Sequence, residues 1–251
     1  MTPVHAITDL AYRLTLVPDL AGVVSPDADA DATGYQIEGC TLHLCYVEVS
    51  EQSKRMLSSK GGLSWSEPCW EVIRDNLEAN IASRTFKVPS AKSSVKTIAA
   101  SFRLPAAANS SDQDVDAASR HDPNLETYQF HVNGINYPHN PVESKKQMLM
   151  EAMKSWHNPH GLNTAIRAAA YGIGAAGSNG NPARDKFFIA QSFDAGLGAS
   201  SKTFSGVSTL AANPLILTTF TGGASAASNV FYFVEYDCKY SISNGVITVS
   251  Y

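Results

Sequence analysis

One glycine-rich segment has the spacing of a cofactor-binding loop. GIGAAG, residues 172–177, fits the dinucleotide fingerprint G-x-G-x-x-G letter for letter. That fingerprint binds a dinucleotide where it follows a strand and opens a helix. In this chain the helix-like run TAIRAAAY precedes it, and SNGNP follows, which cannot begin a helix. We therefore interpret the segment as a loop of small residues and expect no cofactor.

Four histidines that lie near one another in the sequence are candidate metal ligands: His131, His139, His157 and His160. A metal site needs three or four ligands held by further hydrogen bonds. Pro159 lies between the last two histidines and interrupts the helix that would align them. We expect histidines at the surface or at a helix end, and no metal.

Three alternating aspartates, Asp27, Asp29 and Asp31, resemble the start of a calcium loop. The turn glycine and the later bidentate glutamate of that loop are missing, so a solvated acidic loop is the better interpretation.

The nucleophiles follow no catalytic pattern. No serine lies in G-x-S-x-G, and the segment around Cys69, EPCWEV, lacks the glycine, serine and second cysteine of a cysteine-protease motif. The four cysteines contain no C-x-x-C, and Cys40 and Cys45 would face opposite sides of one strand. We expect buried free thiols in a reducing compartment and no enzymatic activity.

Composition narrows the class of protein further. The 251 residues are 44% hydrophobic and 17% charged, with a formal net charge of −4. Such a chain can bury a large core, and no basic cluster favours direct nucleic-acid binding. No apolar run approaches the roughly 18 residues of a membrane span, and the N-terminus has no secretory pattern. We expect neither membrane insertion nor secretion.

Strand patterns dominate the elements that would position these residues. The apolar and alternating runs are YRLTLV, TLHLCYVEV, SVKTIAASFRL, FFIAQSF, LILTTF, NVFYFVEYDCKYSI and GVITVSY. Clusters of Gly, Ser, Asn and Pro separate them, which is typical of antiparallel β architecture. The patternless segment Pro105–Pro123 is a candidate linker between two units, or an exposed surface loop. A short helix is plausible over 50–59.

Asn133-Gly134 is the strongest hairpin signal in the chain. Both central residues of a type I′ turn need positive φ, which Asn and Gly tolerate best. A two-residue loop pairs Val132 with Ile135, His131 with Asn136, and Phe130 with Tyr137. Phe130, Val132, Ile135 and Tyr137 then share an apolar face, while Gln129, His131 and Asn136 point the other way. Pro138 is expected to end the ladder because it lacks an N–H donor.

A helix is expected directly after this hairpin. Asn140 can act as N-cap, Pro141 falls at the first helical position, and Glu143 lies three residues after the cap. Apolar residues then recur at helical spacing: Val142, Leu149, Ala152, Met153 and Trp156.

The hairpin and helix, YQFHVNGINYPHNPV up to SWHN, resemble the second half of double jelly-roll major capsid proteins of the polinton, adintovirus, virophage and adenovirus-hexon lineage. In that family a Y-x-F-x-x-N-G-x-x-Y-P hairpin opens the second jelly roll, and P-V/I leads into a helix. SSVKTIAASFRLP resembles the strand that launches that barrel. FSGVSTLAANPLILTTF and VFYFVEYDCKYSISNGVITVSY resemble its later strands. The resemblance covers residues 35 to 251.

The resemblance implies an all-β double jelly roll: two antiparallel eight-stranded β-sandwich barrels with short flanking helices. Residues 1–104 would form the first jelly roll and 105–251 the second. Only about five strand-like runs precede Pro105, so the first barrel is abbreviated, or the chain begins inside it; we favour the second interpretation. The expected structural residues are Tyr128, Phe130, Asn133, Gly134, Tyr137, Pro138, Asn140 and Pro141.

The implied function is structural. In this family three copies form a pseudo-hexagonal capsomer of an icosahedral shell, so the expected partners are two further copies and neighbouring capsomers. Penton and minor capsid proteins are further candidates, and the location is the virion. The alternative is a β-sandwich module that binds a carbohydrate or receptor, which predicts a concave polar and aromatic patch.

Overall fold

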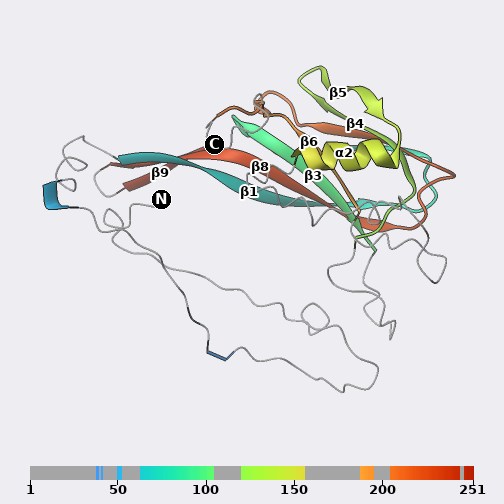
Figure 1. Ribbon diagram of the computed structural model, residues 1–251, viewed down its shortest axis with the longest axis horizontal. Helices are drawn as coiled ribbons and strands as arrows, with labels where there is room; N and C mark the ends of the chain where they lie inside the picture. The colour runs from blue at the N-terminus through green and yellow to red at the C-terminus, as the bar shows by residue number, and fades with distance from the viewer. Residues whose placement is uncertain are drawn as a thin grey trace. The chain divides into compact units, whose positions relative to one another are not determined.

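The computed structural model describes residues 38–39, 41, 50–52, 63–104, 120–155, 187–194, 204–243 and 246–251. The chain divides into two compact units, and most of the described residues belong to the second, which contains Glu67–Ala107, Ala118–Cys238 and Tyr251. Its strands form two antiparallel sheets (Figure 1). Among the described residues, no helix has both the length and the apolar character of a membrane span.

One sheet has the strand order β1-β8-β3-β6, and the other has the order β2-β7-β4-β5. Strand β9 pairs with the last residues of β8. The strands are β1 (Leu63–Leu77), β2 (Ser83–Lys87), β3 (Val95–Arg103), β4 (Leu125–Val132), β5 (Ile135–Val142), β6 (Phe188–Ser192), β7 (Leu215–Phe220), β8 (Ser228–Ser243) and β9 (Val246–Ser250). Strands β1 to β8 therefore have the order of one jelly roll of eight strands.

The core is formed by alternate residues of both sheets. On β3, Ile98, Ala100 and Phe102 are buried and pair with Val234, Tyr232 and Val230 of β8. On the second sheet, Phe130 of β4 pairs with Ile216 of β7, which in turn pairs with Phe86 of β2. All of these side chains belong to a single apolar cluster. The period of two thus places these residues of each sheet in the core, although β3 is buried on both of its faces.

Helix α2 (Lys145–Ser155) is connected to β5 by two residues and packs against β6 (Figure 1). Met148 and Ala152 are fully buried on its inner side, and Leu149 packs against the same core. Of the predicted stripe, Ala152 and Leu149 pack as expected, whereas Val142 lies in β5 and the buried centre of the helix is Met148, which the prediction did not include. Trp156 lies outside the described residues.

The sheet order does not follow the domain boundary predicted between residues 104 and 105. Strands β1, β2 and β3 precede that boundary, yet β2 pairs with β7, and β3 pairs with both β6 and β8. They therefore belong to the same jelly roll as the later strands. A further jelly roll before Leu63 remains a prediction, because those residues, and the linker that follows residue 104, lie outside the described part of the chain.

A buried carboxylate holds the segment before β7 against β3 and β8. Asp237 is fully buried, and its Oδ1 lies 2.9 Å from Nζ of Lys96. Its Oδ2 accepts hydrogen bonds from the Ser94 hydroxyl at 2.8 Å and from the backbone N–H of Phe204 at 2.7 Å. Two residues along, a Cβ on Gly206 would lie 2.2 Å from the Val95 carbonyl oxygen, so only glycine fits there. One acidic side chain thus connects three segments that are distant in sequence.

The replacement Asp237→Asn should lower the free energy of unfolding by about 3 kcal/mol, because it leaves the Lys96 ammonium without its buried counter-charge. Chemical denaturation of the full chain measures this value. The matched control is Glu126→Gln, which neutralises an exposed acid on β4. Equal stability of the two variants would show that Asp237 does not hold the segment.

Candidate functional surfaces

The β4–β5 hairpin is the best-defined feature among the expected structural residues. Asn133 and Gly134 have φ values of 50° and 82°, as a type I′ turn requires. The observed pairs are Val132 with Ile135, His131 with Asn136 and Phe130 with Tyr137, which are the pairs that the sequence predicts. The turn is also anchored from outside, since the Asn133 side-chain amide donates to the Ser208 carbonyl at 2.6 Å.

The predicted apolar face of this hairpin is only partly buried. Phe130 and Val132 are buried and Tyr137 packs against the core, with its ring 5.1 Å from that of Phe193. Ile135, in contrast, is 56% exposed. It follows the exposed turn residues Asn133 and Gly134 directly, whereas its partner Val132 is buried. On the opposite face His131 Nδ1 lies 2.7 Å from Oδ1 of Asn136, which occupies that histidine in a local hydrogen bond.

Pro138 does not end the ladder as predicted. Strand β5 continues to Val142, which pairs with Tyr128 after a register shift. The side-chain amide of Gln129 donates to the carbonyl oxygens of Pro138 and His139, at 3.1 and 2.9 Å. A side chain thus replaces the ladder bonds across the irregular part of the strand, and this long-range contact has no sequence signal.

The helix also begins later than the sequence predicts. Asn140 and Pro141 lie in β5, and the N-cap is Ser144, whose hydroxyl accepts from the N–H of Gln147 at 3.2 Å. The Gln147 side chain in turn accepts from the N–H of Glu143 at 3.1 Å. The sequence S-x-x-Q was the available signal for this start, and strand pairing of Val142 excludes the earlier one.

The first residue of α2 is attached to the turn before β4. Nζ of Lys145 lies 2.7 Å from Oδ2 of the buried Asp122 and donates to the Leu125 carbonyl at 2.8 Å. Asp122 Oδ1 accepts from the N–H of Leu125 at 3.1 Å. Lys145 therefore fixes the start of the helix to the turn before β4 and to β4 itself.

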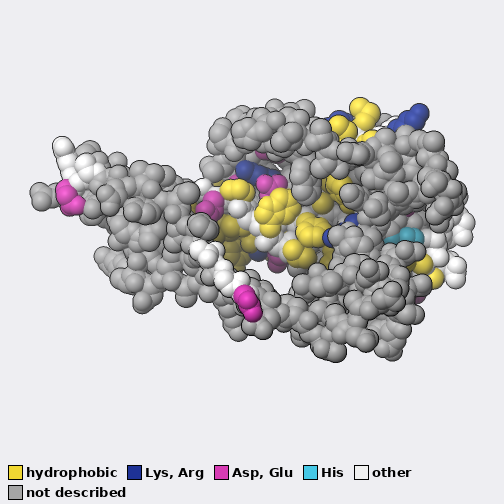
Figure 2. Space-filling model, turned by 60° about the horizontal axis from the view of Figure 1, so that its bottom comes forward, with side chains coloured by type: hydrophobic (Ala, Val, Ile, Leu, Met, Phe, Trp, Pro, Cys, Tyr) yellow, Lys and Arg dark blue, Asp and Glu magenta, His cyan; other side chains and the backbone are white. Residues whose placement is uncertain are grey.

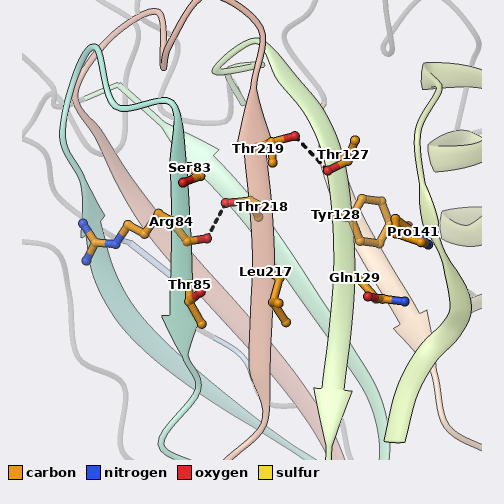
Figure 3. Close-up of a pocket in the computed structure, with 10 residues that line it drawn as sticks. All are labelled: Ser83, Arg84, Thr85, Thr127, Tyr128, Gln129, Pro141, Leu217, Thr218 and Thr219. Atoms are coloured by element: carbon orange, nitrogen blue, oxygen red, sulfur yellow. Dashed lines mark hydrogen bonds between the residues drawn. The ribbon is translucent and has the colours of Figure 1, made fainter.

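A groove of about 330 Å³ lies on the outer face of the β2-β7-β4-β5 sheet (Figure 3). Its outward-facing side chains are Ser83, Thr85, Thr127, Gln129, Leu217 and Thr219. The hydroxyls of Thr127 and Thr219 are 2.8 Å apart, and the hydroxyl of Thr218 donates to the Arg84 carbonyl at 2.8 Å. The Arg84 guanidinium points away from the groove (Figure 3) and lies 3.2 Å from the Asp75 carboxylate.

Among the described residues, the lining of this groove contains neither a catalytic pair nor an exposed aromatic ring. Its outward side chains are hydroxyl, amide and aliphatic groups, which supply neither a general acid nor a strong base. Tyr128 contributes to its wall but is fully buried, so its ring offers no exposed stacking face. In the part of the chain that the structure describes, no group of three or more acidic, histidine or cysteine side chains is placed to hold a metal.

Two tyrosines of β8 have raised pKa values for structural reasons. Burial first, and then the Asp75 carboxylate that accepts from its hydroxyl at 3.1 Å, raise the pKa of Tyr232. Burial, together with nearby Cys238, raises the pKa of Tyr236 to about 12. Both shifts favour the neutral phenol, so neither residue is prepared to act as a base. Cys69 and Cys238 are in the thiol form and not in a disulfide. The remaining candidates at residues 27–31, 40, 45, 157, 160 and 172–177 lie outside the described residues.

Comparison with solved structures identifies the fold. The chain matches the protein of the crystal structure "PBCV-1 VP54 fitted into a cryo-EM reconstruction of the virophage Sputnik", with a TM-score of 0.50 and 11% identity over 80% of this chain and 54% of that one. The chain has the fold of a viral major capsid protein. It spans about half the length of that protein.

Two further capsid proteins match with lower TM-scores. The Faustovirus major capsid protein has a TM-score of 0.45 at 14% identity, over 76% of this chain and 36% of that one. The mavirus major capsid protein has a TM-score of 0.41 at 12% identity, over 76% and 41%. No protein-family profile and no curated protein sequence matches the chain. The capsid fold is therefore visible in the structure and not in whole-chain sequence similarity.

The turn of the capsid-fold hairpin makes a specific prediction. Gly134→Val should destabilise the protein by about 1–3 kcal/mol, because a β-branched residue is strained at positive φ. Nothing lies within 4 Å of the position that a Cβ would occupy, so the loss reports backbone strain and not a clash. Gly134→Asn is the control, since asparagine tolerates this conformation. Equal midpoints of denaturation for the two variants would refute the turn assignment.

The position of the helix start can be tested in the same way. Ser144→Ala should cost about 1 kcal/mol and speed hydrogen exchange in the first turn of α2, because it removes the cap. Asn140→Ala should leave exchange in α2 unchanged. If Asn140→Ala instead speeds hydrogen exchange in the first turn of α2, then Asn140 is the N-cap, as the sequence pattern predicts.

Proposed function

We propose that this chain is a structural subunit of a viral capsid. The observation that carries the proposal is the jelly-roll sheet order, β1-β8-β3-β6 opposite β2-β7-β4-β5, in a chain whose fold matches a major capsid protein. Copies of the subunit form trimers that serve as pseudo-hexagonal capsomers of an icosahedral shell in the virion. Neighbouring capsomers are its partners, and it has no enzymatic role.

Three features of the described residues support a structural role. The groove on the β2-β7-β4-β5 sheet carries no exposed aromatic ring or catalytic pair. Ion pairs of the core, Lys96 with Asp237 and Lys145 with Asp122, fix loops and a helix instead of forming an open site. The β4–β5 hairpin contains Tyr128, Phe130, Asn133, Gly134 and Tyr137, and we propose that the role of these residues is structural.

The groove gives the alternative function, binding of a carbohydrate or receptor, a defined place. Its hydroxyl and amide groups can form hydrogen bonds with a sugar, with Leu217 as the apolar part of the floor. The two functions predict different oligomeric states of the protein. They also differ in the partner of the Gln129 side-chain amide, which in this structure donates to carbonyl oxygens of β5.

Size-exclusion chromatography with light scattering on the full chain separates the two functions. A capsid subunit should elute with three times the mass of one chain, and should show no saturable binding on a glycan array. A stable monomer that binds a glycan, and loses that binding in Thr85→Ala, would overturn the capsid function in favour of the groove.

A further inference from the structure

The two sheets differ sharply on their outer faces. The outer face of β2, β7 and β4 carries mainly hydroxyl and amide side chains, as a solvated sheet face does. The outer face of β1 and β8 carries the exposed residues Trp70, Val72 and Arg74 and the half-buried residues Phe231, Phe233 and Glu235, which together we name the β1–β8 face. Trp70 is 49% exposed and Val72 is 59% exposed, although the inner face of the same sheet already supplies the core. Figure 2 shows hydrophobic side chains gathered on one face of the molecule, with acidic and basic side chains beside them.

Contacts along the two strands give their relative register. The Arg74 guanidinium lies 5.6 Å from the centre of the Phe231 ring and donates to the Asn229 side chain at 3.0 Å. Nine residues earlier on β1, Trp65 stacks on Tyr240, nine residues later on β8. The strands therefore run antiparallel, with Val72 beside Phe233 and Trp70 beside Glu235.

This register gives the β1–β8 face opposite charges at its two ends. Arg74 marks one end, Glu235 marks the other, and Val72 and Phe233 lie midway between them. A two-fold axis across the strands at the level of Val72 and Phe233 exchanges the two ends. It places Arg74 of one copy against Glu235 and Trp70 of the other, where an ion pair and a cation–π contact can form. The face is thus complementary to itself, which is the requirement for an isologous interface.

We propose that the β1–β8 face binds the same face of a second copy of this chain. The apolar middle supplies the burial, and the two Arg74–Glu235 pairs fix the direction in which the copies meet. Arg74 is already held over Phe231 and by Asn229, so little side-chain freedom is lost when the copies associate. The pairing adds a two-fold contact to the proposed capsid function and does not depend on trimer formation.

A charge exchange tests this arrangement. Sedimentation velocity of the full chain over a range of concentrations measures the dissociation constant of the two-fold pair. The measurement applies whether the associating unit is a single chain or a trimer. Arg74→Glu and Glu235→Arg should each raise that constant on the order of 10-fold to 100-fold, because each creates two like-charge contacts. The double variant should restore it, because every pair again has opposite signs. Leu210→Arg, at an apolar residue that is 61% exposed elsewhere, is the control and should leave the constant unchanged.

The outcomes separate this proposal from the proposed function. If trimers form but the single variants pair as the wild type does, the β1–β8 face is not the contact and the capsid function stands. If the double variant restores pairing but no trimer forms, the two-fold contact is supported and the proposed capsomer is not. Loss of pairing that the double variant fails to restore overturns the two-fold arrangement. A wild-type chain that stays monomeric while hydrogen exchange shows β1 protected also overturns it, because residues of the same chain would then cover the face.

Discussion

Packing of aromatic rings between the two sheets is the interaction on which the rest of the structure depends. Phe86, Phe102, Tyr128, Phe130, Phe187 and Tyr232 are all essentially inaccessible to solvent. The Phe86 ring lies 6.3 Å from that of Phe102 and 6.2 Å from that of Tyr232, so a residue of one sheet touches two strands of the other. Each such ring contributes about 1.5–3 kcal/mol by leaving water. Without this aromatic layer the two sheets would lose the contact that packs them face to face, and neither outer surface would form.

Local features of the chain follow from its sequence with good accuracy. Asn133-Gly134 determined the hairpin because positive φ at two successive residues leaves few other choices. The alternation in β4 identified Phe130 and Val132 as its buried face, because side chains on a strand alternate with a period of two. These signals are contained within a few residues, which is why no knowledge of the fold is needed to interpret them.

Non-local features did not follow from the sequence. The pairing of Val142 with Tyr128 extends β5 through an Asn-Pro pattern that otherwise favours a helix start. The order β1-β8-β3-β6 joins strands separated by more than a hundred residues, so a linker-like segment suggested a boundary where the sheets have none. Asp237 carried a weak signal, a charge within an apolar run, but Ser94, Lys96 and Phe204 as its partners were visible only in three dimensions.

A structural function depends on surfaces, and here the two outer faces have different chemistry. The polar face is solvated around a groove, whereas the β1–β8 face places aromatic and aliphatic groups between opposite charges. The measurement that tests the shell function most directly is cryo-electron microscopy of the purified full-length chain. We predict particles with pseudo-hexagonal capsomers, whose density contains the β1-β8-β3-β6 and β2-β7-β4-β5 sheets in every copy. Isolated single chains, at concentrations where the protein is folded and pure, would contradict it.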